Sequence, residues 1–259
     1  GSFVAVSAGG AHSCGVKSDD TLACWGVDHH DQASPPTGSF VAVSAGGAHS
    51  CGLKTDASVA CWGADADNQV TNTPTGSFLA VSAGGAHSCG LQSDDTLACW
   101  GADTQGQASP PSGTFVAVSA GYAHTCGLRT DETVVCWGNN ADGQAPTGPR
   151  TGPFSTVSAG YEHSCGLKTD GTVDCWGDNT VGQTSPPAGG TFVEISAGRW
   201  HTCGLKTNGT VACWGATGSG RANPPAGSTF AAVSAGGLHT CGLKTDASVA
   251  CWGDDTYGQ

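Results

Sequence analysis

A motif of about 38 residues repeats seven times along this chain of 259 residues and accounts for almost all of it. In its first copy the motif runs from Phe3 through His12, Cys14 and Cys24-Trp25 to a glutamine at position 32. The tryptophan of the motif recurs at steps of 37, 38, 37, 39, 38 and 38 residues. A fixed period of this size indicates a repeat architecture and overrides the two domains that the length alone would suggest. We therefore expect one domain over residues 1–259.

Short runs within each copy, such as Phe3–Ser7 and Leu22–Trp25, alternate between apolar and small residues. A period near two favours strands, and no run has the period of a helix. An Asp-Gly pair at 170–171 indicates a hairpin turn between the second and third runs, and the Pro-Pro segments indicate connections outside the sheets. Three or four short strands per copy predict an all-β fold, a seven-bladed β-propeller. We expect the N-terminal strand Phe3–Ser7 to close the ring by pairing with the last repeat.

The 14 cysteines occur as two per repeat, always ten residues apart. If the hairpin is centred on Asp19, Cys14 lies directly opposite Cys24, at a spacing close to that of a disulfide. The recurring histidine and the two cysteines would supply three of four zinc ligands, but no fourth ligand recurs, so we favour disulfides and structural histidines. A regular, even set also favours an extracellular location. The expected disulfides are Cys14–Cys24, Cys51–Cys61, Cys89–Cys99, Cys126–Cys136, Cys165–Cys175, Cys203–Cys213 and Cys241–Cys251.

The charge of the chain narrows its possible partners. The formal net charge is −12, and the nine Lys and Arg residues are spread singly. Nucleic acid requires clustered positive charge, so we do not expect it as a partner. No stretch approaches 18 consecutive apolar residues, so we expect no membrane insertion. No catalytic group departs from the repeat, and we expect a protein without enzymatic activity or a cofactor.

Side chains that depart from the repeat are the candidates for function. In repeats one to three the two positions before the recurring histidine are Gly-Ala, and in repeats four to six they become Tyr-Ala, Tyr-Glu and Arg-Trp. Strand direction places this phase on one face of consecutive blades, and Tyr, Trp and Arg dominate binding hot spots. Repeat drift on a solvated loop is the alternative to a binding surface. The candidate partner-binding residues are Tyr122, Tyr161, Arg199, Trp200, Leu238, Tyr257, His29 and His30.

The pair His29-His30 lies between two aspartates and could in principle hold a transition metal. Adjacent side chains in a short loop rarely converge on one ion, so we predict no metal site and include the pair only as residues of the face.

The order Ala-Gly-x-x-His-Ser/Thr-Cys, Cys-Trp-Gly and Gly-Gln resembles the regulator of chromosome condensation repeat family in its short bacterial form, over all seven copies. The resemblance implies a seven-bladed propeller. In repeat length the chain is most similar to the propeller-type β-lactamase inhibitors, which are secreted and bind their target through loops of one face. It departs from the nucleotide-exchange members, which bind chromatin and a small GTPase, in its acidity, its short repeats and its paired cysteines. The glutamine of the motif is Arg221 in the sixth repeat.

Two classes of function are consistent with these features. The first is a secreted, non-catalytic module that recognises a protein, or a glycan stacked on the aromatic residues, through loops on one propeller face. The second is a structural propeller segment that self-associates in an extracellular fibre or surface assembly, which the similarity of the repeats and the low charge also suit.

Overall fold

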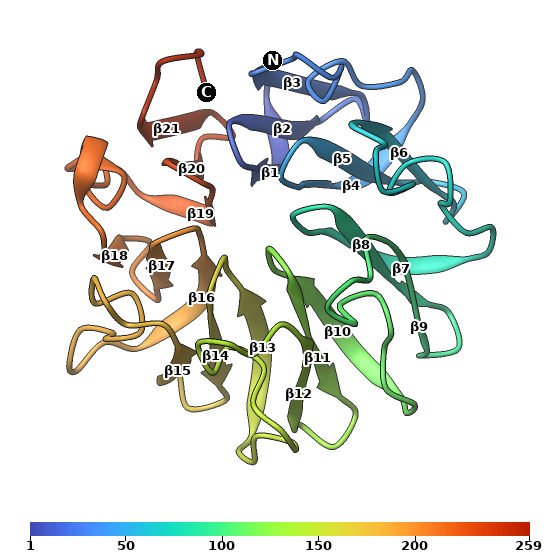
Figure 1. Ribbon diagram of the computed structural model, residues 1–259. Coiled ribbons are helices and arrows are strands. Elements are labelled where there is room, and N and C mark those ends of the chain that lie inside the picture. Colours follow the sequence, from blue (N-terminus) through green and yellow to red (C-terminus); the bar gives the residue numbers. More distant parts are fainter.

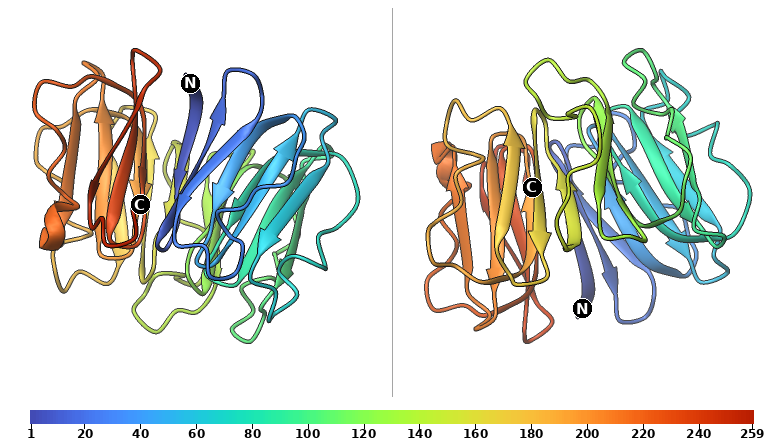
Figure 2. Two further views of the ribbon diagram at one scale, coloured as in Figure 1. Left: turned by 90° about the horizontal axis from the view of Figure 1, so that it is seen from above. Right: turned by 90° about the horizontal axis from the view of Figure 1, so that it is seen from below.

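Each repeat forms one three-stranded antiparallel sheet in the computed structural model, which describes residues 1–259. In the first blade, β1 (Phe3–Ala8) lies next to the ring axis, β2 (His12–Lys17) is central and β3 (Leu22–Gly26) is outermost, as Figure 1 shows. The edge-on views of Figure 2 show that the turns gather on the two faces of a disc. The predicted seven-bladed, all-β propeller is therefore confirmed.

The other six blades repeat this order. Their strands are β4 (Phe40–Ala45), β5 (His49–Lys54), β6 (Val59–Gly63), β7 (Phe78–Ala83), β8 (His87–Gln92), β9 (Leu97–Gly101), β10 (Phe115–Ala120), β11 (His124–Arg129), β12 (Val134–Gly138), β13 (Phe154–Ala159), β14 (His163–Lys168), β15 (Val173–Gly177), β16 (Phe192–Ala197), β17 (His201–Lys206), β18 (Val211–Gly215), β19 (Phe230–Ala235), β20 (His239–Lys244) and β21 (Val249–Gly253). The single helix is a 3-10 turn, η1 (Gly218–Gly220), and no helix has the length and apolarity to cross a membrane.

A glycine in every central strand makes room for the phenylalanine that begins the inner strand. A Cβ atom on Gly15 would lie 2.6 Å from Cδ1 of Phe3, which real Cβ atoms do not tolerate. The same contact recurs in all seven blades, so the phenylalanine ring packs flat across the backbone of its own sheet. This close packing explains why glycine stands inside a strand, where it otherwise weakens the ladder.

The seven predicted disulfides are all present, and no cysteine is free. Cys14 pairs directly with Cys24 across β2 and β3, and their Cα atoms are 4.0 Å apart. Bonded cysteines cannot ligate zinc, so the alternative of a His-Cys-Cys metal site fails. In the chain-entropy model each small closed loop stabilises the fold by about 2–3 kcal/mol.

Ring closure differs from the expectation. Strand β1 pairs with β2 of its own repeat, so the prediction that Phe3–Ser7 would pair with the last repeat was wrong. Each repeat already contains three strands in register, with β1, β2 and β3 in the first blade and β19, β20 and β21 in the last. The seventh and first blades therefore meet through the contacts used at the other junctions, among them a hydrogen bond of 2.8 Å from the Phe3 N–H to the Ala247 carbonyl.

The recurring histidines link neighbouring blades. Nε2 of His12 lies 2.8 Å from Oγ of Ser50 in the next blade, and Ser50 Oγ donates to the carbonyl of Gln32 at 3.1 Å. Because the hydroxyl hydrogen is used on the carbonyl, the hydroxyl must accept from an N–H on Nε2. Burial independently favours the neutral form of the ring, and it lowers the pKa of these histidines to about 3–4. The seven are His12, His49, His87, His124, His163, His201 and His239.

Candidate functional site

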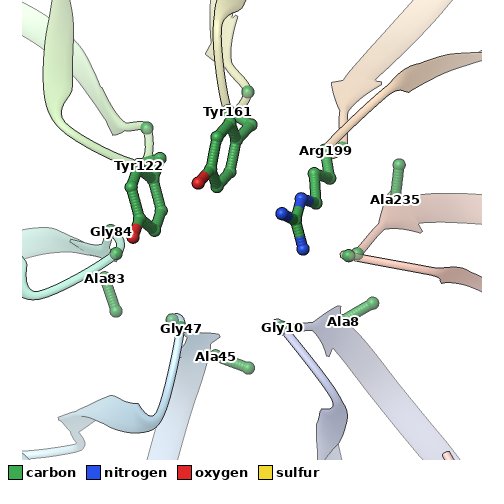
Figure 3. A pocket seen from close by; sticks show the side chains of 18 of the residues that line it. Ala8, Gly10, Ala45, Gly47, Ala83, Gly84, Tyr122, Tyr161, Arg199 and Ala235 are labelled. Carbon is green, nitrogen blue, oxygen red and sulfur yellow. The ribbon is translucent and has the colours of Figure 1, made fainter. Parts of the chain in front are cut away.

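The turns between the first and second strands of all seven blades surround a cavity of about 540 Å³ on the ring axis, shown in Figure 3. We call this cavity the channel mouth. The Gly10 N–H donates to the Gly46 carbonyl of the next blade at 2.9 Å, and the same bond recurs around the ring until Gly237 donates to Gly9 at 2.9 Å. A closed circle of seven backbone hydrogen bonds thus forms the rim of the cavity.

Most of the rim carries no side chains, because neighbouring turns approach closely. A Cβ atom on Gly10 would lie 2.5 Å from the carbonyl oxygen of Gly47. Three consecutive blades depart from this rule, since Tyr122, Tyr161 and Arg199 occupy the same phase. Figure 3 shows their side chains projecting from one wall into the opening, opposite a wall of glycine and alanine.

The large side chains of this wall form a continuous stack. The rings of Tyr122 and Tyr161 are stacked with centroids 3.9 Å apart, and the Arg199 guanidinium lies 4.7 Å from the Tyr161 ring and 4.1 Å from the Trp200 ring. Arg221 lies 5.7 Å from the Trp200 ring. Cation–π contacts of this kind hold a guanidinium plane in place. Both Tyr161 and Arg199 thus have neighbours in the stack on either side, and Nε of Arg199 is left without a hydrogen-bond partner.

The structure divides the other predicted residues into two groups. Leu238 lines the channel mouth, and Trp200 is half-buried behind Arg199 without lining it. His29 and Tyr257 lie on the outer loops of the same face, with ring centroids 6.4 Å apart in an edge-to-face contact. His30 is exposed on the same outer loop. None of these three outer residues lines the mouth.

Arg199 is the only charged side chain that lines the channel mouth. It makes no ion pair, since the salt bridge of the protein joins Arg150 to Asp174 at 2.8 Å. Its Nε is buried and has no hydrogen-bond partner. The neighbouring carboxyl of Glu162 has a raised pKa, chiefly because of burial and also because of nearby aspartates. The cavity thus holds one fixed positive charge with unused donors.

Acidic side chains surround this positive charge. The channel face, defined as the seven turns after the inner strands and the six residues after each third strand, contains ten acidic and two basic residues. The opposite hairpin turns, counted together with the last residue of each central strand, contain nine acidic and six basic residues. Most of the net charge of the protein is therefore on the face that carries the channel mouth.

One departure from the repeat escaped the sequence analysis. Glu194 stands on the inner strand β16 where the other repeats have alanine or threonine. Its Oε1 accepts a hydrogen bond of 3.3 Å from the Val233 N–H in the next blade, and burial raises its pKa to about 7. The signal in the sequence is a single charged residue at a position where the other repeats have small residues.

The fold and the mouth together define a disulfide-linked seven-bladed β-propeller with a cavity built from loops at its axis. The chain belongs to the family of the Regulator of chromosome condensation (RCC1) repeat, which confirms the resemblance seen in the motif. The family matches seven times, at residues 3–32, 40–69, 78–107, 115–144, 154–183, 192–221 and 230–259. No curated protein sequence matches the chain.

Several solved structures share the fold. The ectodomain of the receptor kinase CR4 from Physcomitrella patens is 30% identical, with a TM-score of 0.84 over 98% of this chain and 74% of that one. The CRINKLY WD40 ectodomain of the receptor kinase ACR4 from Arabidopsis thaliana is 28% identical, with a TM-score of 0.80 over 97% of this chain and 95% of that one. Prp20p from Saccharomyces cerevisiae is 15% identical, with a TM-score of 0.81 over 95% of this chain and 84% of that one, and supports the fold alone.

Proposed function

We propose that the chain is an extracellular, non-catalytic module that binds a protein partner at the channel mouth. The observation that carries the proposal is the grouping of Tyr122, Tyr161 and Arg199 on one wall of a cavity whose remaining lining, apart from Leu238, is glycine and alanine. Tyrosine and arginine are enriched in binding hot spots, and a concave site with few polar groups is the usual form of a recognition site.

Two further observations support an extracellular setting. Seven disulfides with no free cysteine are typical of proteins from oxidising compartments. The two receptor-kinase structures that resemble the chain at 30% and 28% identity are ectodomains.

The arrangement of the stack favours a protein over a glycan. A sugar ring binds an aromatic side chain through a free ring face, but Tyr161 lies between Tyr122 and Arg199. A Cβ atom on Gly85 would lie 2.8 Å from Cδ2 of Tyr122, so this ring also rests against the turn of the preceding blade. Side-chain edges, hydroxyls and a guanidinium suit the polar groups of an inserted protein loop.

The experiment is capture of the partner from native secretions by the wild-type propeller and by a triple variant, Tyr122→Ala, Tyr161→Ala and Arg199→Ala. We expect the triple variant to bind at least about 100-fold more weakly, because each hot-spot truncation costs about 2 kcal/mol or more. The matched control is His29→Ala with Tyr257→Ala, which removes the outer contact of the same face. A partner that binds the triple variant as tightly as the wild type, but binds the control variant more weakly, would place recognition on the outer loops.

The self-associating alternative has an observation of its own. The residue after the first phenylalanine lies at a β-bulge in every inner strand, and Val4 is 57% exposed there. Four other blades also expose a large aliphatic side chain in this phase: Val41, Leu79, Val116 and Val193. Sedimentation velocity of the wild type against a Leu79→Asp, Val116→Asp variant tests this role, and a protein that stays monomeric at high concentration contradicts it.

A further inference from the structure

The unused hydrogen-bond donors of Arg199 point to a specific ligand group. The chain has four arginines, and Arg150 pairs with Asp174 while Nε of Arg221 donates to the Gly218 carbonyl at 2.8 Å. Nε of Arg199 is buried without an acceptor although the chain has 21 carboxylates. The same is true of Nε in Arg129 and Arg150, but of the three only Arg199 lines the channel mouth. A buried Nε without an acceptor loses its hydration without compensation, which is costly unless a ligand supplies the acceptor.

The guanidinium is also held in one orientation. The Tyr161 and Trp200 rings lie 4.7 Å and 4.1 Å from it, so its planar faces are engaged and its N–H edge is left free. Figure 3 shows that this end of Arg199 points into the opening, on the same wall as the Tyr122 and Tyr161 hydroxyls. A fixed guanidinium edge matches the two oxygens of a carboxylate, because both groups are planar and the two N–H···O bonds are parallel.

We propose that the channel mouth binds a carboxylate carried by an acidic side chain of the partner protein. Arg199 donates both hydrogen bonds to it, and the hydroxyls of Tyr122 and Tyr161 are the neighbouring donors. This inference rests on the proposed function and adds the chemistry of the inserted group.

The acidic face makes such a site selective. Ten acidic residues on the channel face repel a partner whose whole surface is acidic, whereas a single carboxylate on a protruding loop reaches the one positive charge at the axis. The partner loop is therefore expected to carry an Asp or Glu flanked by neutral or basic residues.

The experiment follows the side-chain Nε–Hε signals of the four arginines by NMR during titration with N-acetyl-glutamate amide, whose only carboxylate is on the side chain. N-acetyl-glutamine amide is the neutral control ligand. We expect the Arg199 signal alone to move with the acid, with a dissociation constant of about 1–10 mM, as suits so small a ligand. The Arg150 signal serves as an internal control because Arg150 lies outside the channel mouth and its guanidinium already pairs with Asp174 through Nη2.

Variants separate the roles of the three side chains. Arg199→Lys keeps the charge but loses the planar fork, so the affinity for the probe should fall at least about tenfold. Tyr122→Phe and Tyr161→Phe each remove one neutral hydroxyl and should weaken binding by about threefold to tenfold.

Three outcomes would overturn the inference. The first is an Arg199 signal that does not move at about 50 mM acid, well above the expected dissociation constant. The others are an equal response to the glutamine control and tighter binding of inorganic phosphate than of the acid.

The experiments distinguish failure of this inference from failure of the proposed function. If Arg199 binds the probe but the partner binds the triple variant as tightly as the wild type, the carboxylate site stands and the proposed function fails. If the partner requires the triple set but the probe does not bind, recognition at the mouth stands without a carboxylate.

Discussion

Acidification from pH 7 to pH 5 should destabilise the propeller steeply, because seven histidines must stay neutral in the folded state. Burial lowers their pKa to about 3–4 in the fold, whereas an unfolded histidine titrates near about 6.5. A depressed folded pKa means that the unfolded chain binds more protons at acidic pH. The contribution of these rings is therefore complete above about pH 6.5 and is lost as the pH falls toward about 4.

The loss should be comparable to the whole stability of an ordinary domain. At pH 5 each unfolded histidine is almost fully protonated, which costs the fold about 2 kcal/mol per ring and about 14 kcal/mol for seven. Glu194 acts in the opposite direction, because its pKa is raised to about 7 and its carboxyl becomes easier to bury as the pH falls. It offsets about 2 kcal/mol between pH 7 and pH 5. The net loss of about 12 kcal/mol compares with a typical unfolding free energy of about 5–15 kcal/mol.

Guanidinium unfolding of the oxidised protein, followed by tryptophan fluorescence between pH 7.5 and pH 4.5, measures this dependence. The slope of the unfolding free energy against pH near pH 5 should correspond to a net uptake of about five to six protons, because the histidines take up about six and Glu194 releases almost one. His124→Gln removes one titrating ring and should reduce that uptake by about one. A stability that stays constant between pH 6.5 and pH 5 would refute the claim that these rings are buried and neutral.

Three further changes test other parts of the structure. Trp200→Ala should weaken partner binding about tenfold and change the melting temperature little, because this ring supports the guanidinium without lining the mouth; a large loss of melting temperature with unchanged binding would contradict that role. Gly47→Ala should cost about 1–3 kcal/mol in denaturant unfolding, because its Cβ would lie 2.5 Å from the Gly85 carbonyl oxygen; an unchanged midpoint would show that the turns can separate. Replacing Cys51 and Cys61 together by alanine should cost about 2–3 kcal/mol in the same assay, and an unaffected midpoint would count against the loop-entropy account.

The blade was predictable from the sequence because its contacts are local. The ten-residue spacing of the cysteines and the turn between them set the register, and the structure has Cys14 opposite Cys24 as expected. Contacts between blades were not predictable in the same way, because the similar repeats do not indicate which residues of neighbouring blades touch. The spacing of the motif thus gave no indication that His12 would bond to the Ser50 hydroxyl of the next blade.

Strand direction predicted which face a loop occupies but not its distance from the axis. The turn after the inner strand reaches the axis, and the loop after the outer strand stays at the edge of the disc. Tyr122 and Arg199 therefore meet at the mouth, whereas His29 and Tyr257 lie outside it. Glu194 was not predicted as a functional residue because it is a single charge within a strand, whereas the predicted binding residues are mainly aromatic and lie in turns.

The junction between the last and first blades has a mechanical consequence. Trp25 donates to the carbonyl of Gln259 at 3.1 Å, as Trp62 donates to that of Gln32 at 3.0 Å, so the bonds at this seam match those elsewhere. Six junctions are also tethered by a loop such as residues 27–39, which returns a separated blade at high effective concentration. Within residues 1–259 the seam has no such tether, and Figure 1 shows the two ends of the chain beside it. A chain limited to residues 1–259 should therefore open first at the seam, and a force applied to residues 1 and 259 would separate its blades one at a time.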